Sequence, residues 1–395
     1  MENKKSSDSL SVVLFVDNFY PAVDGVVRTV HNYAKILNET DRVAVVAPRY
    51  FHFVDNQPYK VIRSASLYSI FKDVAVAIKS TNLRARYQIR KQRANLYHVH
   101  SPFVIGHFAL RLARRNHVPI VATFHSKYKD DFMKYFNNRL VTSFLMGYVM
   151  RFYNAVDEVW ACSPATADTL RSYGFKKNIV VMENGTDFVF PDNIERLKSL
   201  ARQKFGIDPT KKNLLFVGQL IKQKNLLLVM DTVNELCQSD PDYVLTIAGT
   251  SLVEKEIKEY AKNLACHDRI HFVGIVKDSD LLKGLYGCAD LFFFPSLYDN
   301  APLVVREAAV MKLPSLLSKG STCAEVIVDG ENGFLAEPTV LGMSEKIKEL
   351  FDDRNLLTEA GTKAAATIPV SWKVVLERAR TEYRRVIDDY WRRKK

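Results

Sequence analysis

Residues 290–318 read DLFFFPSLYDNAPLVVREAAVMKLPSLLS, and this stretch decides the class of fold. The apolar run before Pro295 predicts a buried strand. The apolar residues from Leu303 predict a helix, since Pro302 suits a first helical position. A second short apolar run, PSLLS, follows at once. A strand, a helix and another strand in this order, with both strands buried on two faces, indicate a parallel sheet that helices cover on both sides.

The same alternation recurs through both halves of the chain. Longer amphipathic segments separate the short apolar runs, and the chain of 395 residues is too long for one ordinary core. We therefore expect an α/β protein of two Rossmann-like, doubly wound parallel-sheet domains. The runs that predict strands are SVVLFV, RVAVVA, LYHVH, PIVATFH, EVWACS and IVVMEN in the first half, and NLLFVG, YVLTIAG, RIHFVG, DLFFFP and PSLLS in the second.

A polar segment over residues 190–212, which carries Pro and Gly, marks the break between the two halves. We predict a first domain over residues 1–192, a second over residues 193–372, and a final amphipathic helix over residues 373–395. Ligands of open parallel sheets bind beyond the carboxyl ends of the strands, so two facing domains predict a central cleft. Neither half contains GxGxxG or a P-loop, which argues against ligands that are held by those motifs.

The net charge of +12 is unevenly distributed. No Asp or Glu occurs between Asp73 and Asp130, whereas eleven Lys or Arg do. A solvated face, an anionic lipid surface or a nucleic acid would each account for such a segment. The chain has no nucleic-acid motif, so we expect no nucleic-acid partner. Six of the basic residues fall within residues 79–93: Lys79, Arg84, Arg86, Arg90, Lys91 and Arg93.

The cysteines and the apolar runs bear on the compartment. The five cysteines are scattered and form no CxxC pair, so we expect free thiols in a reducing compartment and no metal site. No apolar stretch reaches the ~18 residues of a transmembrane helix. The first residues lack the apolar centre of a signal peptide. Together these features predict a cytoplasmic location.

Two carboxylates flank the start of the helix that is predicted from Leu303. Glu307 lies just over one turn inside it among apolar residues, where it can accept hydrogen bonds from a ribose diol. It can equally be a surface glutamate or a cap. Asp299 lies in the preceding loop, where it can accept from a sugar hydroxyl or be an ordinary turn residue. The free N–H groups and the positive dipole end of the helix favour a phosphate nearby.

Three further elements lie where predicted strands end. In FVGQLIKQKN, Lys222 and Lys224 can neutralise a diphosphate. Gly25, between the first strand and the first helix, lets the backbone approach a phosphate or a sugar. His125 ends a strand at the carboxyl edge of the first sheet. Each also has an ordinary structural explanation: a solvated loop, a connecting turn and a core histidine.

Taken together, these elements resemble the retaining glycosyltransferases of family 4, which have the GT-B fold. The resemblance covers nearly the whole chain. FYPAVDGVV looks like the first glycine loop of the family, and HVHSPFVIGHFALRLARRNHVPIVATFHS is similar to its central block in the first domain. ENGTD looks like the end of that domain, and FVGQLIKQKN resembles the phosphate loop. GCADLFFFPSLYDNAPLVVREAAVMKLPSLLS resembles the E-x7-E block, and SWKVV matches a final helix that crosses back onto the first domain.

The resemblance implies a role for each matching residue. Glu307 would bind the ribose of the donor nucleotide, Asp299 would hold hydroxyls of the donor sugar, and His125 would lie beside that sugar. Lys224 would face the diphosphate. The other donor contacts that the resemblance implies are Gly25, Gln219, Gly274, Ile275, Asn300, Ala301, Pro302 and Leu303.

Two positions depart from the pattern of the family. Asp299 stands where the family usually has Glu, so the carboxylate has a shorter reach. Gln219 stands where the family usually has Arg, which removes a charge and a bidentate donor. Lys222 is the candidate to replace that charge.

The reaction that the resemblance implies is transfer of a hexose, with retention, from a UDP-sugar such as UDP-glucose or from a GDP-sugar. Lys224 and backbone N–H groups would stabilise the leaving diphosphate. In the family the diphosphate oxygen takes the proton of the acceptor. The resemblance therefore implies neither a metal nor another cofactor.

The segments SPFVIGHFAL and TFHSKYKDDFMKYF look like those of family members that glycosylate diacylglycerol or phosphatidylinositol lipids. With the basic residues 79–93, they predict a membrane glycerolipid as acceptor and peripheral attachment to the inner face of the membrane. The alternative acceptor is a glycan of a capsule, a lipopolysaccharide or another glycoconjugate. A GT-B protein without transferase activity, such as an epimerase relative or a binding protein, is the remote alternative.

Overall fold

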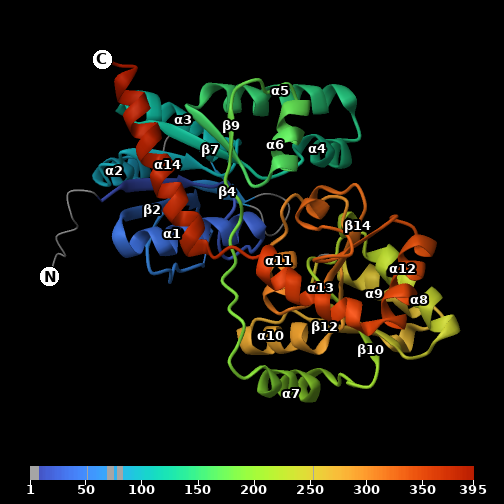
Figure 1. Ribbon diagram of the computed structural model, residues 1–395. Helices are drawn as coiled ribbons and strands as arrows, with labels where there is room; N and C mark the ends of the chain where they lie inside the picture. Colours follow the sequence, from blue (N-terminus) through green and yellow to red (C-terminus); the bar gives the residue numbers. More distant parts are fainter. Residues whose placement is uncertain (1–8, 51, 69–74, 78–82, 252) are drawn as a thin grey trace. The chain divides into compact units, whose positions relative to one another are not determined.

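The computed structural model describes residues 9–50, 52–68, 75–77, 83–251 and 253–395. The chain forms two compact units, Met1–Asn184 with Trp372–Lys395, and Gly185–Ser371 (Figure 1). The boundary that we predicted at residue 192 therefore falls inside the second unit. The reason is local pairing, because the N–H of Thr186 donates to the carbonyl of Val370 at 2.8 Å.

The first unit contains a parallel sheet with the strand order β3-β2-β1-β6-β7-β8-β9. The six strands that the sequence predicts are confirmed. The strand β3 was missed because its sequence, KVIRS, mixes charged and apolar residues at the edge of the sheet. A short antiparallel pair accompanies the sheet. The strands are β1 (Ser11–Phe15), β2 (Arg42–Pro48), β3 (Lys60–Ser64), β4 (Ser66–Tyr68), β5 (Ala75–Ala77), β6 (Leu96–Val99), β7 (Ile120–Phe124), β8 (Glu158–Ala161) and β9 (Ile179–Val181).

Two groups of helices cover this sheet. Side chains of α2, α3, α5 and α6 share one apolar core with alternate residues of the strands. The helices α1 and α14 pack against each other, as Figure 1 shows for the red C-terminal helix. The hydroxyl of Tyr383 on α14 lies 2.6 Å from Nδ1 of the buried His98. The helices are α1 (Gly25–Thr40), α2 (Leu83–Lys91), α3 (Val104–Asn116), α4 (Tyr128–Phe136), α5 (Arg139–Ala155), α6 (Pro164–Ser172) and α14 (Trp372–Arg392).

The second unit contains a parallel sheet with the order β12-β11-β10-β13-β14-β15. The five predicted strands are confirmed. The strand β15 was missed because its three residues, FLA, are too few to show a pattern. The strands are β10 (Lys212–Val217), β11 (Tyr243–Ala248), β12 (Ile270–Gly274), β13 (Leu291–Phe293), β14 (Ser315–Ser318) and β15 (Phe334–Ala336).

The segment that we read as a polar break contains a helix, α7, that packs against α10. The contact is close because Gly284 has no side chain: an added Cβ would lie 2.2 Å from the carbonyl oxygen of Leu197. The helical elements of this unit are α7 (Ile194–Phe205), η1 (Lys222–Lys224), α8 (Leu226–Ser239), α9 (Glu254–Lys262), η2 (His267–Arg269), α10 (Ser279–Cys288), α11 (Leu303–Val310), η3 (Thr322–Val326), α12 (Val340–Asp352) and α13 (Arg354–Thr367).

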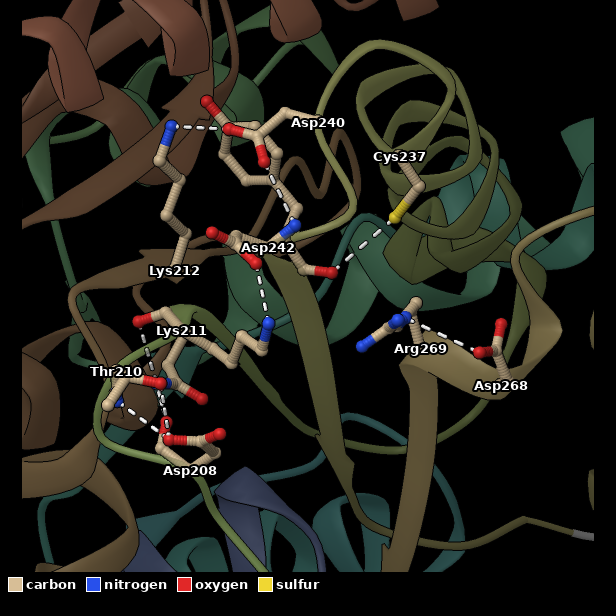
Figure 2. A network of polar contacts seen from close by, with 11 residues as sticks. Asp208, Thr210, Lys211, Lys212, Cys237, Asp240, Asp242, Asp268 and Arg269 are labelled. Atoms are coloured by element: carbon tan, nitrogen blue, oxygen red, sulfur yellow. Dashed lines mark hydrogen bonds and ion pairs between the residues drawn. The ribbon is translucent and has the colours of Figure 1, made fainter.

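A network of charged residues ties together the loops at the amino edge of the second sheet (Figure 2). Lys212, the first residue of β10, lies 2.7 Å from Asp240, and Lys211 lies 2.5 Å from Asp242. Asp208 accepts hydrogen bonds from the N–H and the hydroxyl of Thr210. Since ligands of parallel sheets bind at the carboxyl edge, we assign this network to structure.

Two further properties belong to the residues that the structure describes. Within those residues, no helix combines the length and the apolar character that crossing a bilayer requires. The five cysteines all carry free thiols.

Candidate active site

The loop between β13 and α11, at the carboxyl edge of the second sheet, holds Asp299 in place. The hydroxyl of the buried Ser296 donates to Oδ2 of Asp299 at 2.6 Å. The hydroxyl of Thr322 donates to the backbone carbonyl of Asp299 at 2.8 Å. The thiol of Cys323 donates to the carbonyl of Ser296 at 3.2 Å. Asp299 was predicted from the sequence, whereas Ser296, Thr322 and Cys323, which support it, were missed.

Lys224 reaches Asp299 from the neighbouring strand. Because β10 and β13 pair in the sheet, the loops that follow them lie side by side. Nζ of Lys224 is 2.5 Å from Oδ1 of Asp299 and 5.2 Å from the ring centroid of Phe294. The two charged side chains are only 14% and 16% exposed. The sequence predicted both residues for the site, and the structure adds that they form a shielded ion pair.

Glu307 lies in the second turn of α11 and is buried, with 6% of its surface exposed. Its Oε2 accepts a hydrogen bond from the hydroxyl of Tyr286 at 3.0 Å. Tyr286 is fully buried on α10, with its ring against Phe188 and Phe292. The hydrogen bond fixes the direction of the carboxylate. Tyr286 was missed because, in the sequence, it is one apolar residue among many.

The start of α11 differs in two details from the prediction. The helix begins at Leu303, and Pro302 occupies the position before it rather than the first helical position. The helix is also less apolar than we described, because Arg306 is buried in it and donates to the carbonyl of Ile368 at 2.7 Å. Asn300 is buried in the loop before the helix, and Ala301 is partly buried.

The other predicted donor contacts of this unit lie at the ends of β10 and β12. Gln219 and Lys222 have exposed side chains, one before η1 and one at its start. Gly274 ends β12 with a φ of +71°, and its carbonyl accepts from the N–H of Gly249 at 2.9 Å. Ile275 is 57% exposed. Their contacts with a nucleotide stay predictions.

Gly25 belongs to the first unit and is the first residue of α1, not part of the loop before it as we expected. Asp24 caps the helix, and its Oδ1 accepts from the N–H of Val27 at 2.8 Å. An added Cβ at Gly25 would meet no described atom within 4 Å. The surface at this helix start is therefore open.

His125 also belongs to the first unit and follows β7 at the carboxyl edge. Its Nε2 lies 3.0 Å from Nδ1 of His100, which follows β6. Burial lowers the pKa of His125 to about 4, so the ring is neutral at physiological pH. Asp17, beyond the end of β1, shares this edge, and burial raises its pKa to about 7. Asp17 was not predicted from the sequence; its Oδ1 accepts a hydrogen bond from the N–H of Ile105 at 2.8 Å.

The basic residues 79–93 fall largely on α2. Lys79 lies outside the described residues. Arg84, Arg90, Lys91 and Arg93 are exposed, whereas Arg86 is half-buried. A hollow of about 560 Å³ opens between α2 and the C-terminal end of α3. Five basic residues line it: Arg86, Arg90, Lys91, Arg93 and Arg115.

Comparison with known sequences gives matches over both units. Residues 23–189 match the family described as Glycosyltransferase Family 4, and residues 198–367 match Glycosyl transferases group 1. Alpha-monoglucosyldiacylglycerol synthase of Streptococcus pneumoniae is 25% identical over 77% of this chain and 70% of its own. The enzyme of the same name from Acholeplasma laidlawii is 22% identical over 76% and 78%. Mannosylfructose-phosphate synthase of Agrobacterium fabrum is 27% identical over 61% and 52%.

A solved structure agrees with the fold. The structure of Alr3699/HepE of Anabaena in complex with UDP and glucose superimposes with a TM-score of 0.76, at 15% identity, over 94% of this chain and 99% of the other. Both units thus match glycosyltransferase families in sequence, and the fold is that of a protein solved with UDP and glucose. The chain belongs to the glycosyltransferases of family 4, with the GT-B fold.

Proposed function

We propose that the protein transfers a hexose, with retention, from a nucleoside diphosphate sugar to a membrane glycerolipid. The observation that carries the proposal is the shielded Lys224–Asp299 pair beside the start of α11, with Glu307 held by Tyr286 in the same helix. A charge pair, a helix N-terminus and a fixed carboxylate fit the parts of one ligand: sugar, diphosphate and ribose.

Donor binding redistributes the partners of Lys224. In the structure its charge faces Asp299. A diphosphate at the start of α11 offers a stronger anionic partner, so the ammonium turns towards the phosphate oxygens and frees Asp299 for a sugar hydroxyl. Glu307 accepts from the ribose hydroxyls. In the same unit, Gly274 leaves room for the backbone to approach the ligand.

The chemical step depends on stabilising the leaving diphosphate. Lys224 and the N–H groups at the start of α11 neutralise the charge that develops as the glycosidic bond breaks. The acceptor hydroxyl attacks from the side that the diphosphate leaves, which retains the anomeric configuration. The departing phosphate oxygen takes the proton of the acceptor. His125 is neutral at physiological pH, so it can position a sugar hydroxyl without adding charge.

Two features support a lipid acceptor and attachment to the inner membrane face. The hollow between α2 and α3 gathers five basic residues, which suits anionic headgroups. Two of the relatives are named as glucosyldiacylglycerol synthases. Another relative is named as a mannosylfructose-phosphate synthase, so a sugar is the second candidate for the acceptor.

The proposal is tested with purified protein, UDP- and GDP-hexoses, and three acceptor arms: diacylglycerol or its glucoside in mixed micelles, sugar phosphates, and no acceptor. We expect a glycolipid product in the first arm, with an α-linkage, as NMR would show, if the donor is an α-linked hexose. If product forms only in the sugar-phosphate arm, the acceptor is a sugar and not a lipid. If no donor sugar nucleotide is hydrolysed or transferred in any of the three arms, the proposed transferase activity is contradicted.

Reversing three arginines of α2 tests the membrane docking. The variant R84E/R86E/R90E should bind anionic vesicles at least about tenfold more weakly, because each basic residue near the surface contributes ~1 kcal/mol. Donor hydrolysis should be unchanged. Co-sedimentation with neutral and anionic vesicles measures the effect.

The matched control reverses three exposed lysines of the second unit, K255E/K277E/K363E, which changes the net charge equally. Equal release by the control variant would mean that total charge, and not the surface of α2, governs binding. Unchanged binding of both variants would rule out electrostatic docking.

Tyr286→Phe tests the positioning of Glu307. Removing one hydroxyl that donates to a carboxylate should raise the donor KM about tenfold and leave kcat nearly unchanged, since the hydrogen bond orients the ribose contact. Tyr260→Phe is the control, because its hydroxyl donates to Asp231 at 2.6 Å in the same unit. A KM that is unchanged in Tyr286→Phe would show that Glu307 does not need this partner.

A further inference from the structure

The tip of the hairpin formed by α4 and α5 exposes a set of large apolar side chains. Leu140 is 83% exposed, Phe144 78% and Tyr135 75%, and Phe136 and Val141 are also exposed. We call these five residues the hairpin surface. Leu140 and Phe144 stand four positions apart on α5, so they lie on one side of the helix. Exposed apolar side chains that gather in this way mark an interaction site.

The first unit does not need the hairpin surface for its own packing. The opposite side of α5, with Val149, Phe152 and Tyr153, is fully buried in the core of the unit. Leu140, Val141 and Phe144 of the hairpin surface therefore lie on a helix that is already anchored in the core, whereas Tyr135 and Phe136 lie in the last turn of α4.

The charges around the hairpin surface favour an anionic bilayer as its partner. Between Asp131 and Asp157 the sequence contains no Asp or Glu. It contains three basic residues, Lys134, Arg139 and Arg151. Nζ of Lys134 lies 5.6 Å from the ring centroid of Tyr135. Aromatic and aliphatic side chains bordered by cations are typical of segments that lie in the interface of a membrane.

The hairpin surface also belongs to the same helical layer as the basic residues of α2. Ala85 and Ile89 of α2 share one buried core with residues of α3 and α5. His107 of α3 stacks on Tyr148 of α5 at 4.0 Å between ring centroids. The same layer of helices thus carries basic residues on α2 and the apolar hairpin surface at the tip of α4 and α5.

We propose that the hairpin surface inserts into the acyl region of the bilayer while α2 binds anionic headgroups. This inference rests on the proposed lipid-glycosylating function. Headgroup binding by α2 and insertion of the hairpin surface differ in their dependence on salt. Headgroup binding is screened by salt, whereas insertion of apolar side chains is not.

The test is the variant L140S/F144S, measured by vesicle co-sedimentation at low salt and at about 1 M salt, where the Debye length is about 3 Å. The parent protein should keep a salt-resistant fraction bound to anionic vesicles. The variant should lose that fraction, with binding at high salt at least about tenfold weaker. The control variant L341S/V328S removes two exposed apolar side chains from the second unit and should bind like the parent.

A second measurement reports insertion directly. In Phe144→Trp, the added tryptophan should be quenched by lipids that carry bromine on the acyl chains, beyond the quenching of the parent protein. Absence of extra quenching, together with unchanged high-salt binding of L140S/F144S, would overturn the proposal. Light scattering without lipid distinguishes a second copy as occupant: a parent dimer that becomes monomeric in L140S/F144S would assign the hairpin surface to self-association.

Failure of this inference is separable from failure of the proposed function. In detergent micelles, where no bilayer is present, L140S/F144S should glycosylate the lipid acceptor like the parent protein. If neither protein makes glycolipid there, the function is wrong. If both do, and the variant still binds vesicles as the parent does at high salt, only the insertion is wrong.

Discussion

Glu307→Ala is expected to abolish measurable binding of a nucleoside diphosphate and of the donor sugar nucleotide. The carboxylate is buried, and Tyr286 fixes one of its oxygens. We propose that it accepts hydrogen bonds from the ribose. Hydrogen bonds to a charged group contribute about 1.5–3 kcal/mol each, so losing two of them weakens binding by about 100-fold or more. Calorimetry with UDP and GDP measures the loss.

Two controls separate binding from folding. Glu307→Gln keeps the size of the side chain and an oxygen that can accept from Tyr286, so it should fold normally and bind the donor with intermediate affinity. Melting curves of both variants show whether the unit is intact, since removing the partner of a buried hydroxyl costs about 1–3 kcal/mol. Unchanged nucleotide affinity in a folded Glu307→Ala protein would remove Glu307 from the donor site.

The sheets could be predicted from the sequence because strands buried on both faces appear as short apolar runs. The runs around Val13, Leu215 and Phe292 each became a central strand. The pattern fails where burial is one-sided or the element is short, as in β3 and β15. The apolar pattern also failed to predict α7, because most of its residues are polar although the helix packs against α10.

The site was predictable only as single residues. Lys224 and Asp299 are 75 positions apart, and their pairing depends on the adjacency of β10 and β13. Tyr286 meets Glu307 from another helix, and His100 meets His125 from another strand. Local patterns mark the ends of strands, where chemistry gathers, but contacts between elements follow from the order of the strands. The order of the strands in a sheet cannot be predicted from the sequence of any single segment.

Lys224→Ala is expected to lower kcat by about 100-fold or more, which is the scale for losing one group that stabilises charge in the transition state. Donor affinity should change less, because the backbone N–H groups and Glu307 remain. Gln219 stands where the family usually has arginine, and Lys222 is the candidate to replace that charge, so the size of the loss in Lys224→Ala also reports how much of the charge on the leaving diphosphate we propose Lys224 to balance. Single-turnover kinetics with saturating donor measure the effect on the chemical step.

The control for this variant is Lys211→Ala. Lys211 also lies 2.5 Å from a carboxylate, that of Asp242, but at the amino edge of the same sheet (Figure 2). The Lys211→Ala variant should therefore have an unchanged kcat. Asp299→Asn completes the comparison, because it removes the anionic partner of Lys224 in the unliganded protein while keeping the lysine and an oxygen that can still accept from a sugar hydroxyl. If Lys224 acts only through this ion pair, Asp299→Asn and Lys224→Ala should lower kcat equally, and the double variant should be no worse. If Lys224 instead acts on the diphosphate, Lys224→Ala should be the more damaging, and a nearly normal kcat in folded Lys224→Ala would refute that role.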